Sequence, residues 1–270
     1  MSEREYEIKR RLSEHLYEAG QYFDGYNIVG IFLQGSQNYG LEVPGSDIDS
    51  KLIITPSFEE IAFNKKPVST THVRANDEHI DFKDIRLYIQ TFRKQNLNFL
   101  EILFTDFKFV NLEYEDEWNK LVSNREAIAR YNIPQAIKSM RGIAKEKYFA
   151  MEHEYPSKIE VLKKYGYDPK QLHHLLRVQD YLKRYIEGES YESCLRPTNP
   201  QYLIGVKLGC YNLEEARIVG KEAIDEVDKM CDEYLKICPT EINKNVDALL
   251  DEVQYNIMEN SIRTELSIDG

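Results

Sequence analysis

Two aspartates with one residue between them, Asp47 and Asp49, stand at the start of a β-branched, apolar run. On a strand, residues i and i+2 project from the same face with Cα atoms roughly 6–7 Å apart, so these carboxylates are expected to converge. They repel each other unless a cation lies between them, and Mg²⁺ prefers such oxygen ligands. Asp81, on a neighbouring predicted strand, supplies a third carboxylate. Three such groups can hold two metal ions about 3.5–4 Å apart, an arrangement that activates an attacking oxygen and stabilises a leaving pyrophosphate.

Gly35 and Ser36 precede the aspartates and have the properties of an anion site. A glycine after a strand lets the backbone approach a ligand closely, and a turn that enters a helix directs free N–H groups outward. The Ser36 hydroxyl adds one more donor, and the triphosphate of a nucleotide fits these groups. Taken alone, a Gly-Ser pair is usually a turn and an Asp-x-Asp is usually a solvated strand end. Their combination with a third aspartate on a later strand is much rarer.

These residues need a sheet to bring them together, and the first part of the chain predicts one. A short apolar, β-branched run predicts a strand over 27–34, a second strand is expected over 48–55 after turn residues, and residues 78–82 suggest a third. An amphipathic helix is expected over 3–19, and helical spacing begins again near residue 85. Beyond about residue 110 the pattern predicts helices, over 134–152, 169–187, 213–236 and 245–264.

The overall charge limits the kinds of partner. The chain has 270 residues and a formal net charge of −11, which argues against a protein that coats DNA or an anionic membrane through its overall field. Residues 138–185 nevertheless carry 11 Lys or Arg against 6 Asp or Glu, a local balance of +5. Such a run is usually a solvated helix surface, and the alternative is a face that contacts phosphates.

The cysteines and the N-terminal residues bear on the compartment. The four cysteines have no C-x-x-C spacing and no nearby pair of histidines, so neither a zinc site nor a redox motif is indicated. The first residues are charged and lack the apolar segment of a signal peptide, and no stretch approaches the ~18 apolar residues of a spanning helix. We therefore expect a reduced, cytoplasmic protein with no membrane partner.

Gly35-Ser36, ten residues, Asp47-Ile48-Asp49 and then Asp81 together form a pattern that resembles the nucleotidyltransferase superfamily of DNA polymerase beta. The segment from Gly35 to Asp49 resembles more narrowly the RNA-ligase-associated (RlaP-like) group of predicted nucleotidyltransferases. Two later stretches, 96–104 and 164–177, are similar to further motifs of that group. The resemblance covers roughly residues 30–190. Gln37 stands where an arginine commonly follows the Gly-Ser of that group.

The resemblance implies an α+β fold with two domains. Residues 1–110 would form the catalytic domain, a mixed sheet of the polymerase-beta type with flanking helices, and residues 111–270 a helical domain that closes over the cleft. The implied reaction transfers a nucleoside monophosphate from an NTP to an acceptor hydroxyl and releases pyrophosphate. It uses two Mg²⁺ or Mn²⁺ ions.

The resemblance also implies roles for single residues. Asp47 and Asp49 would ligate both ions, and Asp81 would ligate the catalytic ion and help to deprotonate the acceptor. The expected nucleotide-binding residues, which would hold the phosphates, are Gly35, Ser36, Lys145, His173 and Arg177. His173 and Lys145 also have simpler interpretations, because a lone histidine on an apolar helix face is more often structural and a lysine is more often solvated, and Arg177 one turn beyond His173 favours a cluster that faces phosphate.

Three functions remain open from the sequence. The acceptor favoured by the resemblance is an RNA end, whereas the acidic net charge favours a protein side chain or a small molecule. The third is a catalytically silent module that binds nucleotide or RNA, and the presence of all three aspartates argues against it. Neither the preferred base nor the oligomeric state follows from the sequence.

Overall fold

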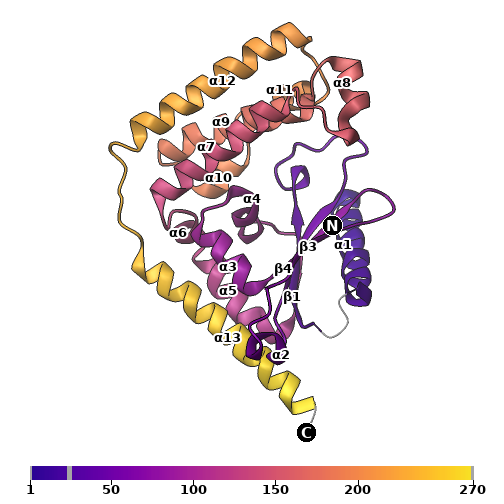
Figure 1. Cartoon of the computed structure of the whole chain (residues 1–270), viewed down its shortest axis with the longest axis vertical. Coiled ribbons are helices and arrows are strands. Elements are labelled where there is room, and N and C mark those ends of the chain that lie inside the picture. The colour runs from indigo at the N-terminus through magenta and orange to yellow at the C-terminus, as the bar shows by residue number, and fades with distance from the viewer. Residues whose placement is uncertain (1, 23–25, 269–270) are drawn as a thin grey trace. The chain divides into compact units, whose positions relative to one another are not determined.

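A computed structural model describes residues 2–22 and 26–268 of the chain (Figure 1). It contains one five-stranded mixed sheet and many helices, which confirms the expected α+β class. Two compact units can be distinguished by their internal contacts. The first comprises Met1–Asn38, Gly45–Tyr131 and Ile242–Gly270, and the second comprises Tyr39–Pro44 and Asn132–Glu241. The first unit therefore extends past the expected boundary near residue 110, to Tyr131. It also includes the C-terminal segment of the chain, from Ile242 onward.

The sheet belongs to the first unit and has the strand order β3-β4-β2-β1-β5. β1 (Ile28–Gln34) and β2 (Asp49–Ile54) are antiparallel, whereas β2 and β4 (His79–Asp84) are parallel. β3 (Ser69–Val73) and β5 (Lys108–Val110) are the antiparallel edge strands. The three strands predicted from the sequence are confirmed, and they are the central ones. The two edge strands were not predicted.

One face of the sheet is covered by α1 (Glu3–Tyr22), which lies beside the strands in Figure 1. Ile8, Leu12 and Ala19 are buried on this helix at nearly helical spacing. They join one apolar cluster with alternate residues of the strands, namely Ile31, Leu33, Leu52, Ile54, Ile80 and Phe82. The period of two in a strand therefore leaves the other set of side chains on the opposite face.

The opposite face is covered by α3 (Ile85–Arg93), α5 (Glu115–Ser123) and α13 (Lys244–Ile268), which lie on the other side of the strands in Figure 1. Phe32 of β1 stacks on Trp118 of α5, with ring centroids 4.2 Å apart. Hydrogen bonds also hold α13 against this unit. In one of them, Ser261 Oγ of α13 lies 2.6 Å from Thr55 Oγ1. These contacts explain why the end of the chain belongs with the sheet.

Short elements complete the first unit. They are the helices α2 (Phe58–Ala62), α4 (Leu97–Leu100) and α6 (Arg125–Ala129), and the 3₁₀ helices η1 (Ser36–Asn38), η2 (Glu101–Leu103) and η3 (Leu112–Tyr114).

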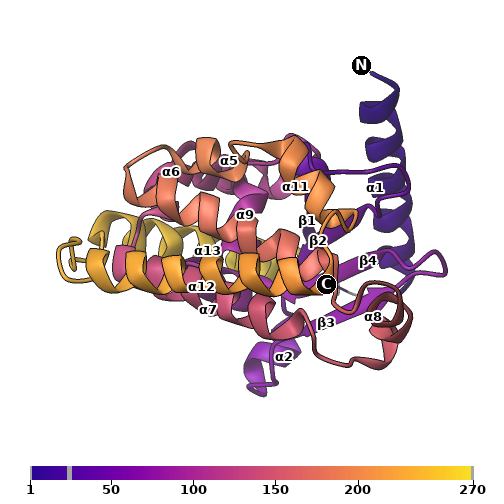
Figure 2. The ribbon, with the colours of Figure 1, turned by 90° about the horizontal axis from the view of Figure 1, so that it is seen from above.

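The second unit is built from helices around α9 (Pro169–Ile186). This helix packs against α7 (Ile133–Ala150), α10 (Tyr191–Leu195), α11 (Pro200–Lys207) and α12 (Leu213–Tyr234), several of which run beside it in Figure 2. A 3₁₀ turn, η4 (Pro156–Lys158), and α8 (Ile159–Tyr165) precede α9.

The ends of two helices in the second unit confirm the sequence signals. Asp168 caps α9, and Pro169 occupies its first turn, where the missing N–H costs nothing. Asn212 and Glu215 form a reciprocal capping box at the start of α12. Within the described ranges of the chain, no helix combines the length and apolarity that crossing a bilayer requires.

Candidate active site

The β1–β2 hairpin brings the two halves of the motif to one end of the sheet. Gln34 and Asp49 are paired across the two antiparallel strands, so the turn that follows β1 and the residues that precede β2 lie side by side. Gly35 has φ +91°, a left-handed conformation that favours glycine, and η1 begins at the next residue, Ser36. Asn38 fixes this turn, because its Nδ2 donates to the Leu33 carbonyl at 3.0 Å.

The space above Gly35 is open. A Cβ atom built on this residue would meet no heavy atom within 4 Å. Its backbone N–H points toward the Glu101 carboxylate, with N and Oε1 3.4 Å apart. Glu101 itself is buried. The side of Gly35 on which a side chain would stand is therefore open to a ligand, whereas its N–H is engaged by the Glu101 carboxylate.

Asp47 and Asp49 occupy different kinds of backbone. Asp49 is the first residue of β2, whereas Asp47 lies in the loop before it and is exposed, so the expected placement of both on one strand holds only for Asp49. The residue between them, Ile48, is buried. The Asp49 carboxylate accepts the backbone N–H of His79 at 2.9 Å and lies 3.2 Å from its Nδ1, and both contacts use the same oxygen, Oδ1.

Glu78 anchors this loop, although the sequence did not single it out. It is 2% exposed, and its Oε1 accepts the backbone N–H of Ile48 at 3.0 Å. Its carboxylate also pairs with Arg11 of α1, and Arg74 Nη1 lies 2.9 Å from Oε2. Although burial raises the pKa of Glu78, hydrogen bonds from Arg11 and His15 lower it to about 2. Glu78 is therefore a buried carboxylate that fixes the backbone between the two candidate ligands.

His15 joins Glu78 to Ser50 on the α1 face of the sheet. Its ring nitrogens lie 2.9 Å from Ser50 Oγ and 2.9 Å from Glu78 Oε2. Burial lowers the pKa of His15, so the ring is neutral at pH 7. Nε2–H then donates to the carboxylate, and Nδ1 accepts the Ser50 hydroxyl. This Ser-His-Glu array resembles a hydrolytic triad in its bonding, but His15 and Ser50 are both 0% exposed, so no substrate reaches them.

Asp81 lies on β4 opposite Lys51 of β2, on the sheet face that also carries Asp49. Lys51 is 3% exposed, and its Nζ is 3.0 Å from Asp81 Oδ2. The Phe99 ring covers the ammonium at 4.0 Å from its centroid. Lys83 lies two residues after Asp81 on the same face, and burial lowers the pKa of its ammonium. Two lysines therefore accompany the carboxylates, and the sequence reasoning missed both.

The three aspartates do not form a ligand cluster as they stand. Within residues 2–22 and 26–268, no three His, Cys, Asp or Glu side chains are grouped so that they could hold a metal ion. Asp49 and Asp81 share one face but have different partners, His79 and Lys51. Gly35, Ser36, Asp47 and Asp49 thus lie at one end of the β1–β2 pair, whereas Asp81 lies opposite Lys51 further along the sheet and is held by an ion pair.

The predicted nucleotide-binding residues of the second unit have structural contacts. His173 is buried, with Nδ1 2.8 Å from the Leu203 carbonyl, and burial lowers its pKa to about 4. Arg177 is 8% exposed, and its guanidinium stacks 3.8 Å from the centroid of Tyr39, which belongs to the same unit. Lys145 Nζ lies 3.2 Å from Asp228 Oδ1. The contact of His173 supports its structural interpretation, and the contacts of Arg177 and Lys145 are with side chains of the second unit.

Part of the positive charge of the basic segment 138–185 is paired with carboxylates from outside the segment. Arg141 of α7 pairs with Asp228 and Asp232 of α12, which lie outside the segment in the sequence. Arg184 likewise pairs with Glu189. A local excess in the sequence therefore does not produce an equally basic face.

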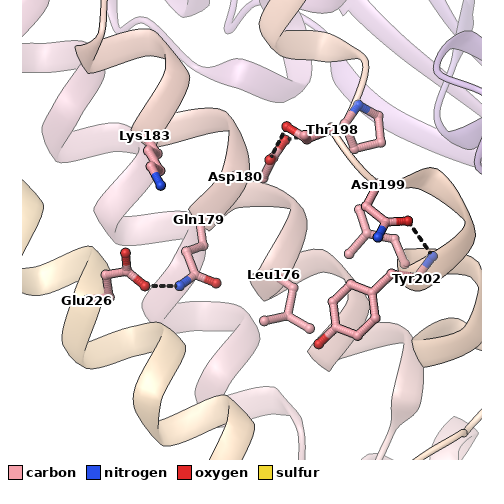
Figure 3. A pocket seen from close by; sticks show the side chains of 10 residues that line it. Leu176, Gln179, Asp180, Lys183, Thr198, Asn199, Tyr202 and Glu226 are labelled. Atoms are coloured by element: carbon pink, nitrogen blue, oxygen red, sulfur yellow. Dashed lines mark hydrogen bonds between the residues drawn. The ribbon is translucent and has the colours of Figure 1, made fainter.

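A pocket of about 270 Å³ lies in the second unit between α9, α11 and α12 (Figure 3). Its lining includes two acidic residues, Asp180 and Glu226, and one basic residue, Lys183. Asp180 accepts the Thr198 hydroxyl at 2.6 Å, and Glu226 accepts from Gln179 (Figure 3). Two carboxylates against one ammonium leave the lining negative, which disfavours a triphosphate.

The chain was compared with protein-family models and with curated proteins. No protein-family model matches the chain, and no curated protein matches it. The geometry of the first unit is therefore the basis for a functional conclusion.

Proposed function

We propose that this chain is a divalent-metal-dependent nucleotidyltransferase of the polymerase-beta type, which transfers a nucleoside monophosphate from an NTP to an acceptor hydroxyl and releases pyrophosphate. One observation carries the proposal. The open side of Gly35, the turn that begins at Ser36 and the carboxylate of Asp49 lie at the same end of the β1–β2 hairpin, and Asp81 shares the face of Asp49. Phosphates bound next to carboxylates would repel them unless a cation lies between the two, and a divalent metal ion would be bound by both.

The residues at this end of the sheet fit a divalent ion bound together with a nucleotide. Asp47 is exposed and Asp49 is 32% exposed, and both contacts of Asp49 with His79 engage Oδ1. Mg²⁺ is usually bound by one or two carboxylates plus substrate phosphates, which suits this pair. When bound, the ion would neutralise the phosphates and polarise the α-phosphoryl group.

The chain's own groups would bind and orient the NTP. The hydroxyl and backbone of Ser36 at the start of η1 would donate to the β- and γ-phosphates, and Gly35 would let these oxygens come close. Glu78, through the Ile48 N–H, keeps Asp47 and Asp49 at a fixed separation. Each of these interactions positions the α-phosphorus for in-line attack by the acceptor hydroxyl.

An RNA end remains the acceptor that we favour, because the resemblance to the RNA-ligase-associated group extends over separate motifs. The ion pairs of Arg141 and Arg184 reduce the number of phosphates that such an RNA could contact in the basic segment. A protein side chain or a small molecule would need none of them. The charge of the protein therefore does not identify the acceptor, and an experiment is needed to distinguish RNA from a protein or a small molecule.

The proposal is tested by incubating the protein with each α-³²P-labelled NTP, Mg²⁺ or Mn²⁺, and a pool of RNA, protein and metabolites. We expect label in one acceptor fraction and no label with Asp49→Asn. Lys83→Gln is the matched control, because it changes a charged residue on the same sheet face without removing a candidate ligand. Absence of label from every fraction with all four NTPs would contradict the proposal, as would label that Asp49→Asn leaves unchanged.

A further inference from the structure

The ion pair between Lys51 and Asp81 is the least expected feature of the candidate site. Lys51 lies in the middle of β2, between β1 and β4, and its side chain is 3% exposed. It is 3.0 Å from Asp81 Oδ2, and the Phe99 ring lies on it at 4.0 Å. A lysine buried in a central strand needs a counter-charge, since desolvation opposes its charged form. Asp81 supplies that counter-charge.

We propose that the Lys51 ammonium takes the place of the second metal ion, so that the site binds one divalent ion, through Asp47 and Asp49, instead of two. This inference rests on the proposed nucleotidyltransferase function. It assigns to Lys51 the neutralising role at Asp81 that a catalytic ion would otherwise have.

Geometry and charge both exclude an ion beside Asp81. Mg²⁺ binds a carboxylate oxygen at 2.0–2.1 Å and requires near-octahedral space around it. The Lys51 ammonium lies at hydrogen-bond distance from Oδ2, where such an ion would have to share the carboxylate with a fixed positive charge. The second oxygen, Oδ1, lies 3.4 Å from the Thr71 hydroxyl. A divalent ion on either oxygen would repel the ammonium.

Lys51 cannot simply move away. The parallel pairing of β2 and β4 places its Cα opposite that of Asp81, and Phe99 covers the ammonium. Lys83 lies near the same ring, 4.9 Å from its centroid, so movement toward α4 brings two like charges together. The pair is therefore a permanent part of the site.

Lys83 provides a matched control on the same face. Its Nζ donates to Ser69 Oγ at 2.7 Å, whereas the Asp81 ion pair is made by Lys51. Removing Lys83 changes the charge of the face by the same amount and leaves the Lys51–Asp81 pair in place.

The test counts bound Mn²⁺ by electron paramagnetic resonance, at saturating concentrations of an NTP whose α–β bridging oxygen is replaced by methylene. We expect one ion per chain for the wild type and for Lys83→Met. Lys51→Met keeps the length and apolar body of the side chain but frees the Asp81 carboxylate, and we expect two ions. Asp49→Asn is expected to abolish binding by the protein.

The outcomes separate this inference from the function on which it rests. Two ions on the wild type would overturn the role of Lys51 and leave the nucleotidyltransferase proposal standing. A count of one ion on the folded Lys51→Met variant would also overturn the proposed role of Lys51, because the second ion would then be excluded by something other than Lys51. If Lys51→Met does not fold, the wild-type count still decides. No ion on the wild type, or a count that Asp49→Asn does not alter, would contradict the proposed function itself.

Discussion

Replacing Glu78 by glutamine tests how the site loop is held. Glu78 is 2% exposed and accepts hydrogen bonds from Ile48, His15, Arg74 and Asn76. Glutamine keeps the shape and one acceptor oxygen but removes the charge. The positive groups that face this position then lose their counter-charge, so the substitution is expected to be strongly destabilising.

The pKa of Glu78 determines how much its ionised carboxylate contributes to the free energy of unfolding. A carboxyl pKa of about 4.3 in the unfolded chain falls to about 2 in the folded protein, which contributes about 3 kcal/mol to the free energy of unfolding at pH 7. Because the folded pKa is depressed, this contribution is complete only above the unfolded pKa and is lost as the pH falls toward 2. By linkage most of this contribution remains at pH 4, and roughly half of it remains at pH 3.

Urea unfolding of the wild type and Glu78→Gln at pH 7, 4 and 3, followed by circular dichroism, measures this difference. Glu18→Gln is the matched control. Glu18 also binds Arg74, at 2.7 Å from its Nε, but its side chain is 26% exposed, so we expect a cost of at most about 1 kcal/mol. A cost for Glu78→Gln that is no larger than that of the control, or that is equal at pH 7 and pH 3, would refute the reasoning.

Three further predictions concern the phosphates and the turn that would hold them. Ser36→Ala removes one donor to an anionic ligand, so the catalytic efficiency should fall ~10- to 100-fold while Mn²⁺ binding is unchanged; an unchanged efficiency would make Ser36 only a turn residue. Gly35→Ala places a side chain at φ +91°, and urea unfolding should show a loss of about 1–2 kcal/mol, because the open space around it leaves backbone strain as the cause. If RNA is the acceptor, its binding constant should depend only weakly on salt, with a log–log slope of magnitude below about 3, because residues such as Arg141 are already paired. A slope near 6 would show an exposed basic face that the ion pairs do not neutralise.

The central strands were predictable from composition and alternation. β1 is an apolar run that is buried on both faces, β2 ends in such a run, and β4 alternates the buried Ile80 and Phe82 with polar residues. β3 is short, polar and mostly exposed, and β5 has only three residues, so neither edge strand carries an apolar pattern. Edge strands form here because their backbones pair with neighbours, which a local pattern does not reveal.

The return of α13 to the first unit was not predictable for a related reason. Its apolar face predicts a helix and a partner surface but does not say which surface. Contacts with residues more than a hundred positions away fix it, for example Arg93 with Asp247. The balance of charge over 138–185 depends in the same way on α12, whose Asp228 and Asp232 face Arg141.

The candidate site was predictable in its motif and not in its supporting groups. Gly35 and the aspartates have spacings that imply chemistry. Lys51 carried one usable signal, because it follows Asp49 by two residues in a strand expected to be central, where a lysine needs a buried counter-charge. Glu78 carried none, since an acidic residue at the start of a strand is ordinarily solvated.

The central claim is that the protein breaks the bond between the α- and β-phosphates and passes the nucleotide to an acceptor. Parallel reactions with α-³²P-labelled and γ-³²P-labelled NTP test it directly, in the acceptor fraction that takes up label. We predict that the α label becomes attached to the acceptor and that the γ label leaves as pyrophosphate in equal amount, both dependent on Asp49. Release of the γ label as orthophosphate, or its transfer to the acceptor, would contradict the account, because either result means that the β–γ bond is the one broken.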